Sequence, residues 1–347
     1  MSRKVGDAGL SIHYGRAQAK DLQALSTADA CKTRYRRQDM APIDQVHLSF
    51  NPQTLALLNS VLGLVMFGVA LELKVDDFRL ALKSPKALAL GLFGHHVLFP
   101  AMTYVLIWVL QPLPSIALGM ILVSSCPAGH ISNFLVHYAR GNTALSVSVS
   151  ALSTVAALVM TPLNFAFWGH LHPITRGLMQ QVAMSPWEML EVIVLLLGVP
   201  LVLGMWVAAR FPVFAARVRQ PMKWLSLLIL MGFIVGALVA NLQHFLAYIN
   251  FVVFVVFIHN LLALGTGYGL STALGLPERD RRAITFEMGI QNSGLGLILI
   301  FNFFNGLGGM AIVTAWWGIW HIVAGMTLAT WWKRRDPQCM VNAGARP

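Results

Sequence analysis

The stretch "ITFEMGIQNSGLGLILI", from Ile284 to Ile300, begins and ends like a membrane-spanning helix but is polar in its middle. Glu287 and Gln291 are four residues apart, so a continuous helix would place both on one face. Gly289 permits a break in that helix, and a break frees backbone carbonyls. A carboxylate, an amide and free carbonyls form a hard-oxygen site, which suits Na⁺ better than a soft metal. Inserting a carboxylate at the bilayer centre costs at least about 3 kcal/mol of free energy. A polar patch that serves only to hold neighbouring helices together therefore explains this stretch poorly.

The composition places this stretch in an all-α integral membrane protein. The 347 residues are 56% hydrophobic and only 11% charged, far from the balance of a soluble domain. Apolar runs repeatedly reach the length that a helix needs to cross a bilayer, and barrel-type alternating strands are absent. About nine transmembrane helices are expected, at 53–73, 86–110, 114–140, 143–169, 189–210, 222–245, 247–275, 280–304 and 309–332.

The net charge of +11 follows membrane topology and does not indicate nucleic acid. Lys and Arg fill the loops on one side and the tail at 333–347, whereas the opposite loops hold only Arg176. The positive-inside rule therefore predicts a multi-pass protein of the cell (inner or plasma) membrane with a cytoplasmic C-terminus and an extracytoplasmic segment at 40–52. The polar extension at 1–39 is basic and contradicts this pattern. Either translation starts at Met40 and the extension is not native, or the extension is a real N-terminal tail.

A second span is interrupted in a similar way. In "SSCPAGHISNFLVHYARGN", from Ser124 to Asn142, Pro127 removes a backbone donor and Gly129 allows a turn. Ser132 and Asn133 then follow the break, as Gln291 and Asn292 follow Gly289. The broken spans are the third and the eighth, so they cross the membrane in opposite directions. Interrupted spans at matching places in two inverted halves indicate the central site of a secondary transporter.

Two serines that follow the first break share a helical face. Ser146 and Ser150 are one turn apart, whereas Ser148 points elsewhere. Hydroxyls in membrane helices usually form hydrogen bonds with their own backbone. Ser146 and Ser150 are therefore candidates for the site only because they directly follow Ser132 and Asn133.

Four segments are similar to those of the bile acid:sodium symporter family. They are "MFGVALELKVDDFRLALKSPKALALG" (66–91), "CPAGHISNFLVHYARGNTALSVSVSALSTVAALVMTP" (126–162), "IHNLLALGTGYG" (258–269) and "FEMGIQNSGLGL" (286–297). The resemblance covers about 53–332 and implies an inverted-repeat transporter, here of nine spans, in which the two broken helices cross. It implies panel-domain helices at 53–73 and 189–245 and core-domain helices at 86–169 and 247–332.

The resemblance also implies sodium-coupled import of an organic anion by alternating access. One Na⁺ site would use side chains of Ser132, Asn133, Ser146, Ser150 and Glu287. A second would use Glu287, Gln291 and backbone carbonyls near Met288 and Ile290. The family usually adds a Gln to the second site where this chain has His95. Imidazole is a poor Na⁺ ligand, but a protonated ring would replace the charge of the ion, so one Na⁺ plus a proton is an alternative to two Na⁺.

Three residues are candidates for contact with the substrate. Asn292 lies beside the expected crossing, and His130 stands at the first break, where the family more often has a small residue. In the last span the family pattern is similar to "WHN", whereas this chain has Trp320, His321 and Ile322. His321 is retained as a candidate, and the lost polar group favours a less polar or differently placed ligand.

Other functions compete with sodium symport. Cys126, just before the break, would suit a metalloid or weak-acid transporter on the same fold, and proton coupling is a further alternative. The three cysteines are widely spaced and indicate neither a disulfide framework nor a zinc site. No span holds HExxH or GxSxG, so an intramembrane enzyme is less favoured and we expect no catalytic residues. The expected partners are a small organic anion and the lipid bilayer; the substrate, the ion count and the oligomeric state are left open.

Overall fold

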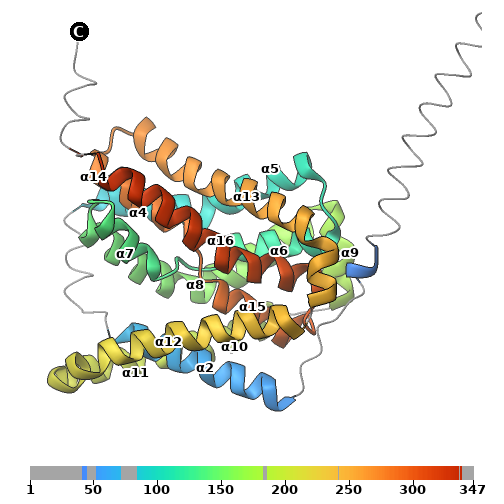
Figure 1. Cartoon of the computed structure of the whole chain (residues 1–347), viewed down its shortest axis with the longest axis horizontal. Coiled ribbons are helices and arrows are strands. Elements are labelled where there is room, and N and C mark those ends of the chain that lie inside the picture. Colours follow the sequence, from blue (N-terminus) through green and yellow to red (C-terminus); the bar gives the residue numbers. More distant parts are fainter. Residues whose placement is uncertain are drawn as a thin grey trace, which may run out of the picture.

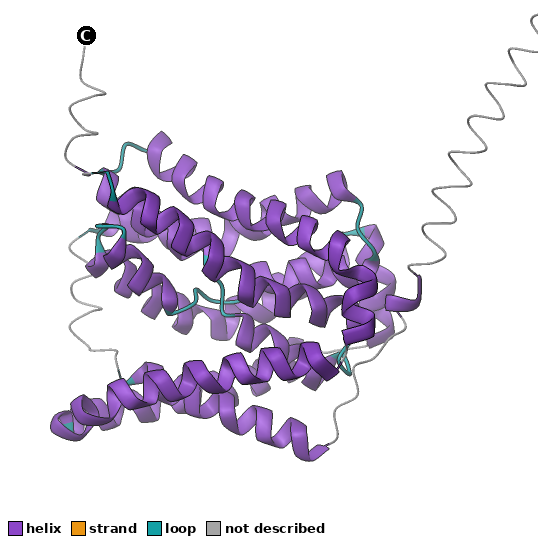
Figure 2. Ribbon diagram, viewed as in Figure 1, coloured by secondary structure: helices purple, strands orange, loops and turns teal. Residues whose placement is uncertain are grey.

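The computed structural model describes residues 41–44, 52–71, 84–182, 186–240, 242–335 and 337. Within these ranges every regular element is a helix, and the only strand-like pairing is one isolated bridge between Ala128 and Gln291 (Figure 2). The extension at 1–39 lies outside the described residues. Of the expected outer segment, Ala41–Asp44 forms the short helix η1, in which Ile43 is fully buried.

The helices form two groups that are visible in Figure 1. One layer contains α2 (Pro52–Ala70), α10 (Pro186–Ile193), the π-helical turn η3 (Val194–Gly198), α11 (Val199–Arg210) and α12 (Pro212–Ala240). The second group begins with α4 (Pro85–Phe93), the π-helical turn η2 (Gly94–Leu98), α5 (Phe99–Leu110), α6 (Pro114–Ser125), α7 (Ile131–Tyr138), α8 (Thr143–Leu171) and α9 (Pro173–Val182). It ends with α13 (Leu242–Ala273), α14 (Glu278–Gly289), α15 (Ser293–Phe303) and α16 (Gly308–Lys333).

Among the residues that the structure describes, five helical stretches are long and apolar enough to cross a membrane. They are Pro85–Leu110, Thr143–Leu171, Trp187–Arg210, Tyr248–Ala273 and Gly308–Lys333. The expected spans at 114–140 and 280–304 are each divided into two shorter helices, α6 with α7 and α14 with α15. The total of nine spans therefore stays a prediction.

One expected boundary is wrong. The span placed at 222–245 belongs to a helix that already begins at Pro212 and ends at Ala240. Proline is tolerated in the first helical turn, because its missing N–H has no partner there. Pro221 lies inside α12, so the basic segment around it is helical and is not the loop that its prolines indicate.

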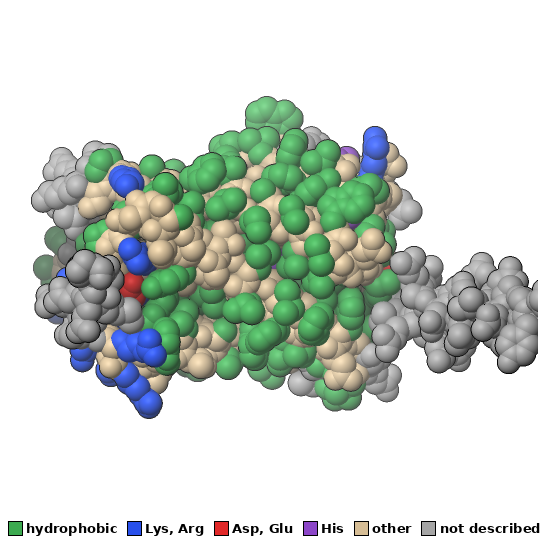
Figure 3. Space-filling model, turned by 90° about the horizontal axis from the view of Figure 1, so that it is seen from above, with side chains coloured by type: hydrophobic (Ala, Val, Ile, Leu, Met, Phe, Trp, Pro, Cys, Tyr) green, Lys and Arg blue, Asp and Glu red, His purple; other side chains and the backbone are tan. Residues whose placement is uncertain are grey.

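The lateral surface is apolar and the charges lie at its ends. Figure 3 shows a broad hydrophobic surface, with Lys and Arg gathered mainly at one end of the molecule. Leu228 is 68% exposed and Val202 is 66% exposed, which suits contact with lipid better than contact with water. Exposed Lys86 and Lys333 lie at the end that holds the start of α4 and the end of α16, whereas Arg176 lies on α9 at the opposite end (Figure 1).

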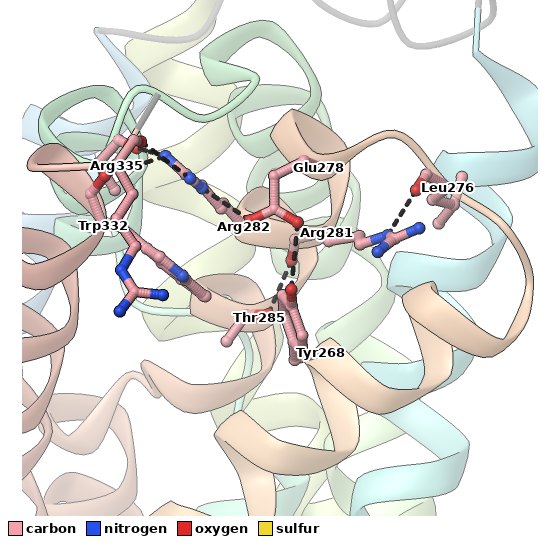
Figure 4. Close-up of polar contacts among 9 residues, drawn as sticks. Tyr268, Leu276, Glu278, Arg281, Arg282, Thr285, Trp332 and Arg335 are labelled. Atoms are coloured by element: carbon pink, nitrogen blue, oxygen red, sulfur yellow. Dashed lines mark hydrogen bonds and ion pairs between the residues drawn. The ribbon is translucent and has the colours of Figure 1, made fainter. Parts of the chain in front are cut away.

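A buried arginine on α14 forms hydrogen bonds at the ends of two other helices, at the basic end of the molecule. Arg282 is fully buried on α14, and its Nε donates to Glu278 Oε1 at 3.0 Å (Figure 4). Its Nη1 donates to the carbonyls of Ala139 and Trp332, and its Nη2 donates to that of Arg335. These carbonyls follow the last turns of α7 and α16 or lie within them, so one guanidinium fixes the ends of both helices against α14.

Candidate functional site

Both predicted helix breaks are present, and they lie against each other. The backbone N–H of Gly129, in the first break, donates to the Ile290 carbonyl at 2.8 Å. The N–H of Asn292, in the second, donates to the Pro127 carbonyl at 2.9 Å. The two breaks therefore form a short antiparallel pair, in which each satisfies backbone groups that the other exposes.

The pairing requires glycine at position 129. A Cβ atom there would lie 2.9 Å from the carbonyl oxygen of Gln291 and 3.1 Å from its carbonyl carbon. Because both contacts are with backbone, the strands of the crossing would have to separate to admit a side chain. Gly129 thus allows both the turn and the close approach of the second break.

Glu287 lies at this crossing, fully buried, and accepts hydrogen bonds from serine hydroxyls of two other helices. Ser132, on α7, donates to its Oε1 at 2.7 Å, and Ser146, on α8, donates to the same oxygen at 2.5 Å. Ser150, also on α8, donates to Oε2 at 2.7 Å. The intervening Ser148 donates instead to the Ala144 carbonyl, as its place on the helix predicts.

Asn133 completes a cluster of oxygen atoms. Its Oδ1 lies 2.8 Å from Ser146 Oγ and 3.3 Å from Ser150 Oγ, and Ser132 Oγ lies 3.4 Å from Ser150 Oγ. Six oxygen–oxygen contacts thus join the side chains of the cluster, but the three hydroxyls supply only three protons. Lone pairs therefore exceed protons at short range, an arrangement that a small hard cation stabilises.

The atoms predicted for a second ion lie nearby but face hydrogen-bond donors. The Met288 carbonyl accepts from Gln291 Nε2 at 2.8 Å, and the Ile290 carbonyl accepts from Gly129 N–H. Gln291 is buried, and its Oε1 has no hydrogen-bond partner among the described residues. The side-chain amide thus turns its N–H toward the break and its oxygen away from Met288.

His95 contacts both breaks. It lies in η2, a π-helical turn in which His95 and the adjacent His96 are both buried. His95 Nδ1 is 2.9 Å from the Glu287 carbonyl oxygen, and Nε2 is 2.9 Å from that of Cys126. Both partners only accept, and a neutral ring carries a single N–H, so it donates to one of these carbonyls, whereas a protonated ring donates to both. Cys126 is buried as a free thiol beside this contact.

The three predicted substrate contacts come from different elements. Asn292 Oδ1 accepts from the Leu295 N–H at 3.1 Å and so caps α15. His130 immediately precedes α7 and is partly buried. His321 is buried on α16, one turn before Gly325, whose Cα faces Leu135 and Ile290. His130 and Asn292 thus lie in the two breaks, whereas His321 lies on α16, one turn from a residue that packs against Ile290.

Two residues at the crossing were not predicted. Asn260, on α13, donates from Nδ2 to the Gly289 carbonyl at 2.7 Å. Ser153 accepts from the Ala128 N–H at 3.3 Å and lies 3.1 Å from His96 Nε2. Ser153 follows Ser146 and Ser150 at helical spacing, so extending that pattern by one turn would have found it. For Asn260 the sequence signal is only an amide inside an apolar span.

Comparisons with known proteins identify the family of this chain. The model of the Sodium Bile acid symporter family matches residues 60–248. The sodium-dependent transporter YocS of Bacillus subtilis is 30% identical over 274 residues, which are 79% of this chain and 82% of YocS. The probable sodium/metabolite cotransporter BASS1 of Arabidopsis thaliana is 32% identical, over 80% of this chain and 67% of that protein. The sodium-dependent organic anion transporter of Mus musculus is 32% identical over 44% of this chain and 39% of its own length. This chain therefore belongs to the sodium bile acid symporter family, whose members are membrane transporters.

Proposed function

We propose that this member of the sodium bile acid symporter family imports a small organic anion together with Na⁺ across the cell membrane. The observation that carries the proposal is the buried oxygen cluster around Glu287, in which six oxygen–oxygen contacts of 2.5 to 3.4 Å share three hydroxyl protons. A Na⁺ ion bound by Ser132, Asn133, Ser146, Ser150 and Glu287 would meet the excess lone pairs and balance the carboxylate.

The cluster links three helices, so an ion bound there would couple them. Ser132 lies in the first turn of α7, Glu287 lies in the last turn of α14, and α8 supplies Ser146. Na⁺ would hold the two breaks in one arrangement. The N-termini of α7 and α15 meet at the crossing, and their positive ends favour a negatively charged substrate. Asn292, His130 and His321 are the proposed substrate contacts.

Alternating access needs two bodies that move against each other. We assign α2 and the α10–α12 layer to the panel domain and the remaining spans to the core domain, in nine spans with an inverted repeat. The basic end, with Lys86 and Lys333, is assigned to the cytoplasm by the positive-inside rule. The substrate class rests on the relatives, of which one is named as a sodium/metabolite cotransporter and another as a sodium-dependent organic anion transporter.

The test is the melting temperature of the purified protein in NaCl, KCl and N-methylglucamine chloride at equal ionic strength. A ligand that binds only the folded protein raises its stability by mass action. We expect a Na⁺-specific increase that disappears in Glu287→Gln and persists in Glu191→Gln, which changes an exposed carboxylate on α10. An equal response to Na⁺ and K⁺, or a full response in Glu287→Gln, would refute the proposed site. Uptake driven by a proton gradient without Na⁺ would favour proton coupling instead.

A further inference from the structure

Every backbone carbonyl of the second break lies within hydrogen-bonding distance of a nitrogen atom of the protein. The break leaves the carbonyls of residues 287–290 without the amide that a continuous helix would supply four residues later. The Glu287 carbonyl contacts His95 Nδ1, and the Met288 carbonyl accepts from Gln291 Nε2. The Gly289 carbonyl accepts from Asn260 Nδ2, and the Ile290 carbonyl accepts from Gly129 N–H.

These contacts are short and come from several directions. The donor–acceptor distances at the four carbonyls are 2.9, 2.8, 2.7 and 2.8 Å, within the range of good hydrogen bonds. The donors belong to η2, α13, the break itself and the loop before α7. Gln291, Asn260 and Gly129 each place the positive end of an N–H dipole against an oxygen that a second cation would need, and His95 does so when Nδ1 carries a proton. A cation there meets repulsion in a region of low dielectric constant.

The orientation of two side-chain amides follows from the same carbonyls. Gln291 and Asn260 face carbonyl oxygens, which only accept, so each must turn its NH₂ group toward the break. Their own oxygens, Gln291 Oε1 and Asn260 Oδ1, are buried without a hydrogen-bond partner among the described residues. Of the oxygens predicted for the second site, Gln291 Oε1 has no hydrogen-bond partner among the described residues, whereas the Met288 and Ile290 carbonyls each accept a hydrogen bond.

His95 extends this arrangement to the first break. Its ring spans from the Glu287 carbonyl to the Cys126 carbonyl, so one rigid side chain joins the ends of α14 and α6. The break carbonyls therefore act as anchoring points for the protein, whereas the side-chain cluster around Glu287 keeps an excess of lone pairs. The two groups of oxygens are chemically different, although both lie at the crossing.

We propose that this chain binds one Na⁺ ion, at the Glu287 cluster, and that Asn260 is a positioning residue, which with His95 fixes the break carbonyls in place of a second ion. This inference rests on the proposed function, because it sets the stoichiometry of the same site. Asn260 holds the Gly289 carbonyl, two residues after Glu287, and so fixes the backbone from which that carboxylate projects. Asn260 needs only its amide N–H for this role, and His95 needs a proton on Nδ1.

The first experiment is equilibrium binding of ²²Na⁺ to the purified full-length protein at constant pH. We expect about one ion per chain, with a hyperbolic isotherm and no specific binding in Glu287→Gln. Two ions per chain, or a sigmoidal isotherm, would overturn the single-ion inference while leaving the proposed function intact. The absence of any Na⁺-specific binding would instead overturn the proposed function itself.

The second experiment separates positioning from stability. Asn260→Leu removes the donor to Gly289, and Asn164→Leu is its matched control, because Asn164 is also buried and donates to a carbonyl outside the break, that of His96, at 2.7 Å. Both variants lose one amide–carbonyl hydrogen bond. We expect Asn260→Leu alone to weaken Na⁺ binding, by about tenfold, and to reduce the preference for Na⁺ over Li⁺. Unchanged Na⁺ affinity in Asn260→Leu, or an equal loss in both variants, would show that Asn260 is only a packing residue.

Discussion

Ser146→Ala and Ser148→Ala test the candidate sodium site with one chemical change at two neighbouring positions of α8. Both serines are buried, and both substitutions place alanine, a strong helix former, in the same helix. Only Ser146 contacts the Glu287 carboxylate and Asn133 Oδ1, whereas Ser148 donates to the Ala144 carbonyl on its own helix. A difference in Na⁺ response between the two variants therefore reports on the cluster and not on the helix.

The size of the effect follows from the contacts of Ser146. A hydrogen-bonding partner of a charged group contributes about 1.5–3 kcal/mol, and a loss of about 2 kcal/mol weakens the dissociation constant about 30-fold. At a Na⁺ concentration about 100 times the wild-type Kd, the ion stabilises the folded protein by about 2.7 kcal/mol. At the same concentration, Ser146→Ala would retain only about 0.9 kcal/mol of that stabilisation.

The assay is a Na⁺ titration of the melting temperature, with choline chloride holding the ionic strength constant. Ser148→Ala is expected to follow the wild-type titration curve, displaced by a constant amount at every Na⁺ concentration. Ser146→Ala is expected to need about 30-fold more Na⁺ for the same increase. Parallel curves for Ser146→Ala and Ser148→Ala would refute the reasoning, because the short contact with Glu287 would then make no difference to ion binding.

Three further predictions concern the frame around the site. Gly129→Ala brings a Cβ within 2.9 Å of the Gln291 carbonyl oxygen, so we expect a destabilisation of about 1–3 kcal/mol and a smaller Na⁺ response in thermal melts. Arg282→Met leaves the buried Glu278 without its ion-pair partner, so we expect the free energy of unfolding to fall by about 3–5 kcal/mol. Adding Glu278→Gln should restore part of the lost melting temperature, and no recovery would contradict the ion-pair explanation. Asn59, on α2, and Asn302, on α15, donate to each other from Nδ2 to Oδ1, at 3.2 and 2.9 Å. A double-mutant cycle of Asn59→Leu and Asn302→Leu should therefore give a coupling energy of about 0.6 kcal/mol. Additive effects of the two substitutions would contradict this interaction.

The helix breaks and the serine face were predictable because both follow local rules. Pro127 cannot donate a hydrogen bond, glycine at 129 and 289 favours turns, and residues four apart on a helix share a face. These rules also place Ser148 away from Glu287, as the structure does. The start of α12 was mispredicted because the expected span at 222–245 followed the apolar run alone, whereas the helix begins ten residues earlier, at Pro212.

The donors that hold the break carbonyls were not predictable from local patterns. His95 and Glu287 are 192 residues apart, and Asn260 and Gly289 are 29 apart, so helix packing alone decides that they meet. An exposed carbonyl in a broken span indicates only that some partner is needed. The sequence leaves open whether that partner is a cation or a protein N–H, and this choice decides the number of ions.

The number of ions has a measurable consequence for transport, which any monovalent organic anion accepted by the protein will reveal in proteoliposomes. With one Na⁺ per anion no net charge moves, so a tenfold Na⁺ gradient supports about tenfold accumulation and an imposed potential has no effect on it. With two ions, one net charge moves inward, and each 100 mV adds about 2.3 kcal/mol, or roughly 50-fold more accumulation. Accumulation that is unchanged when a K⁺ diffusion potential is imposed would support the anchored break carbonyls. A strong increase under the same potential would mean that a second cation, Na⁺ or H⁺, moves with each anion, and it would contradict the single-ion inference.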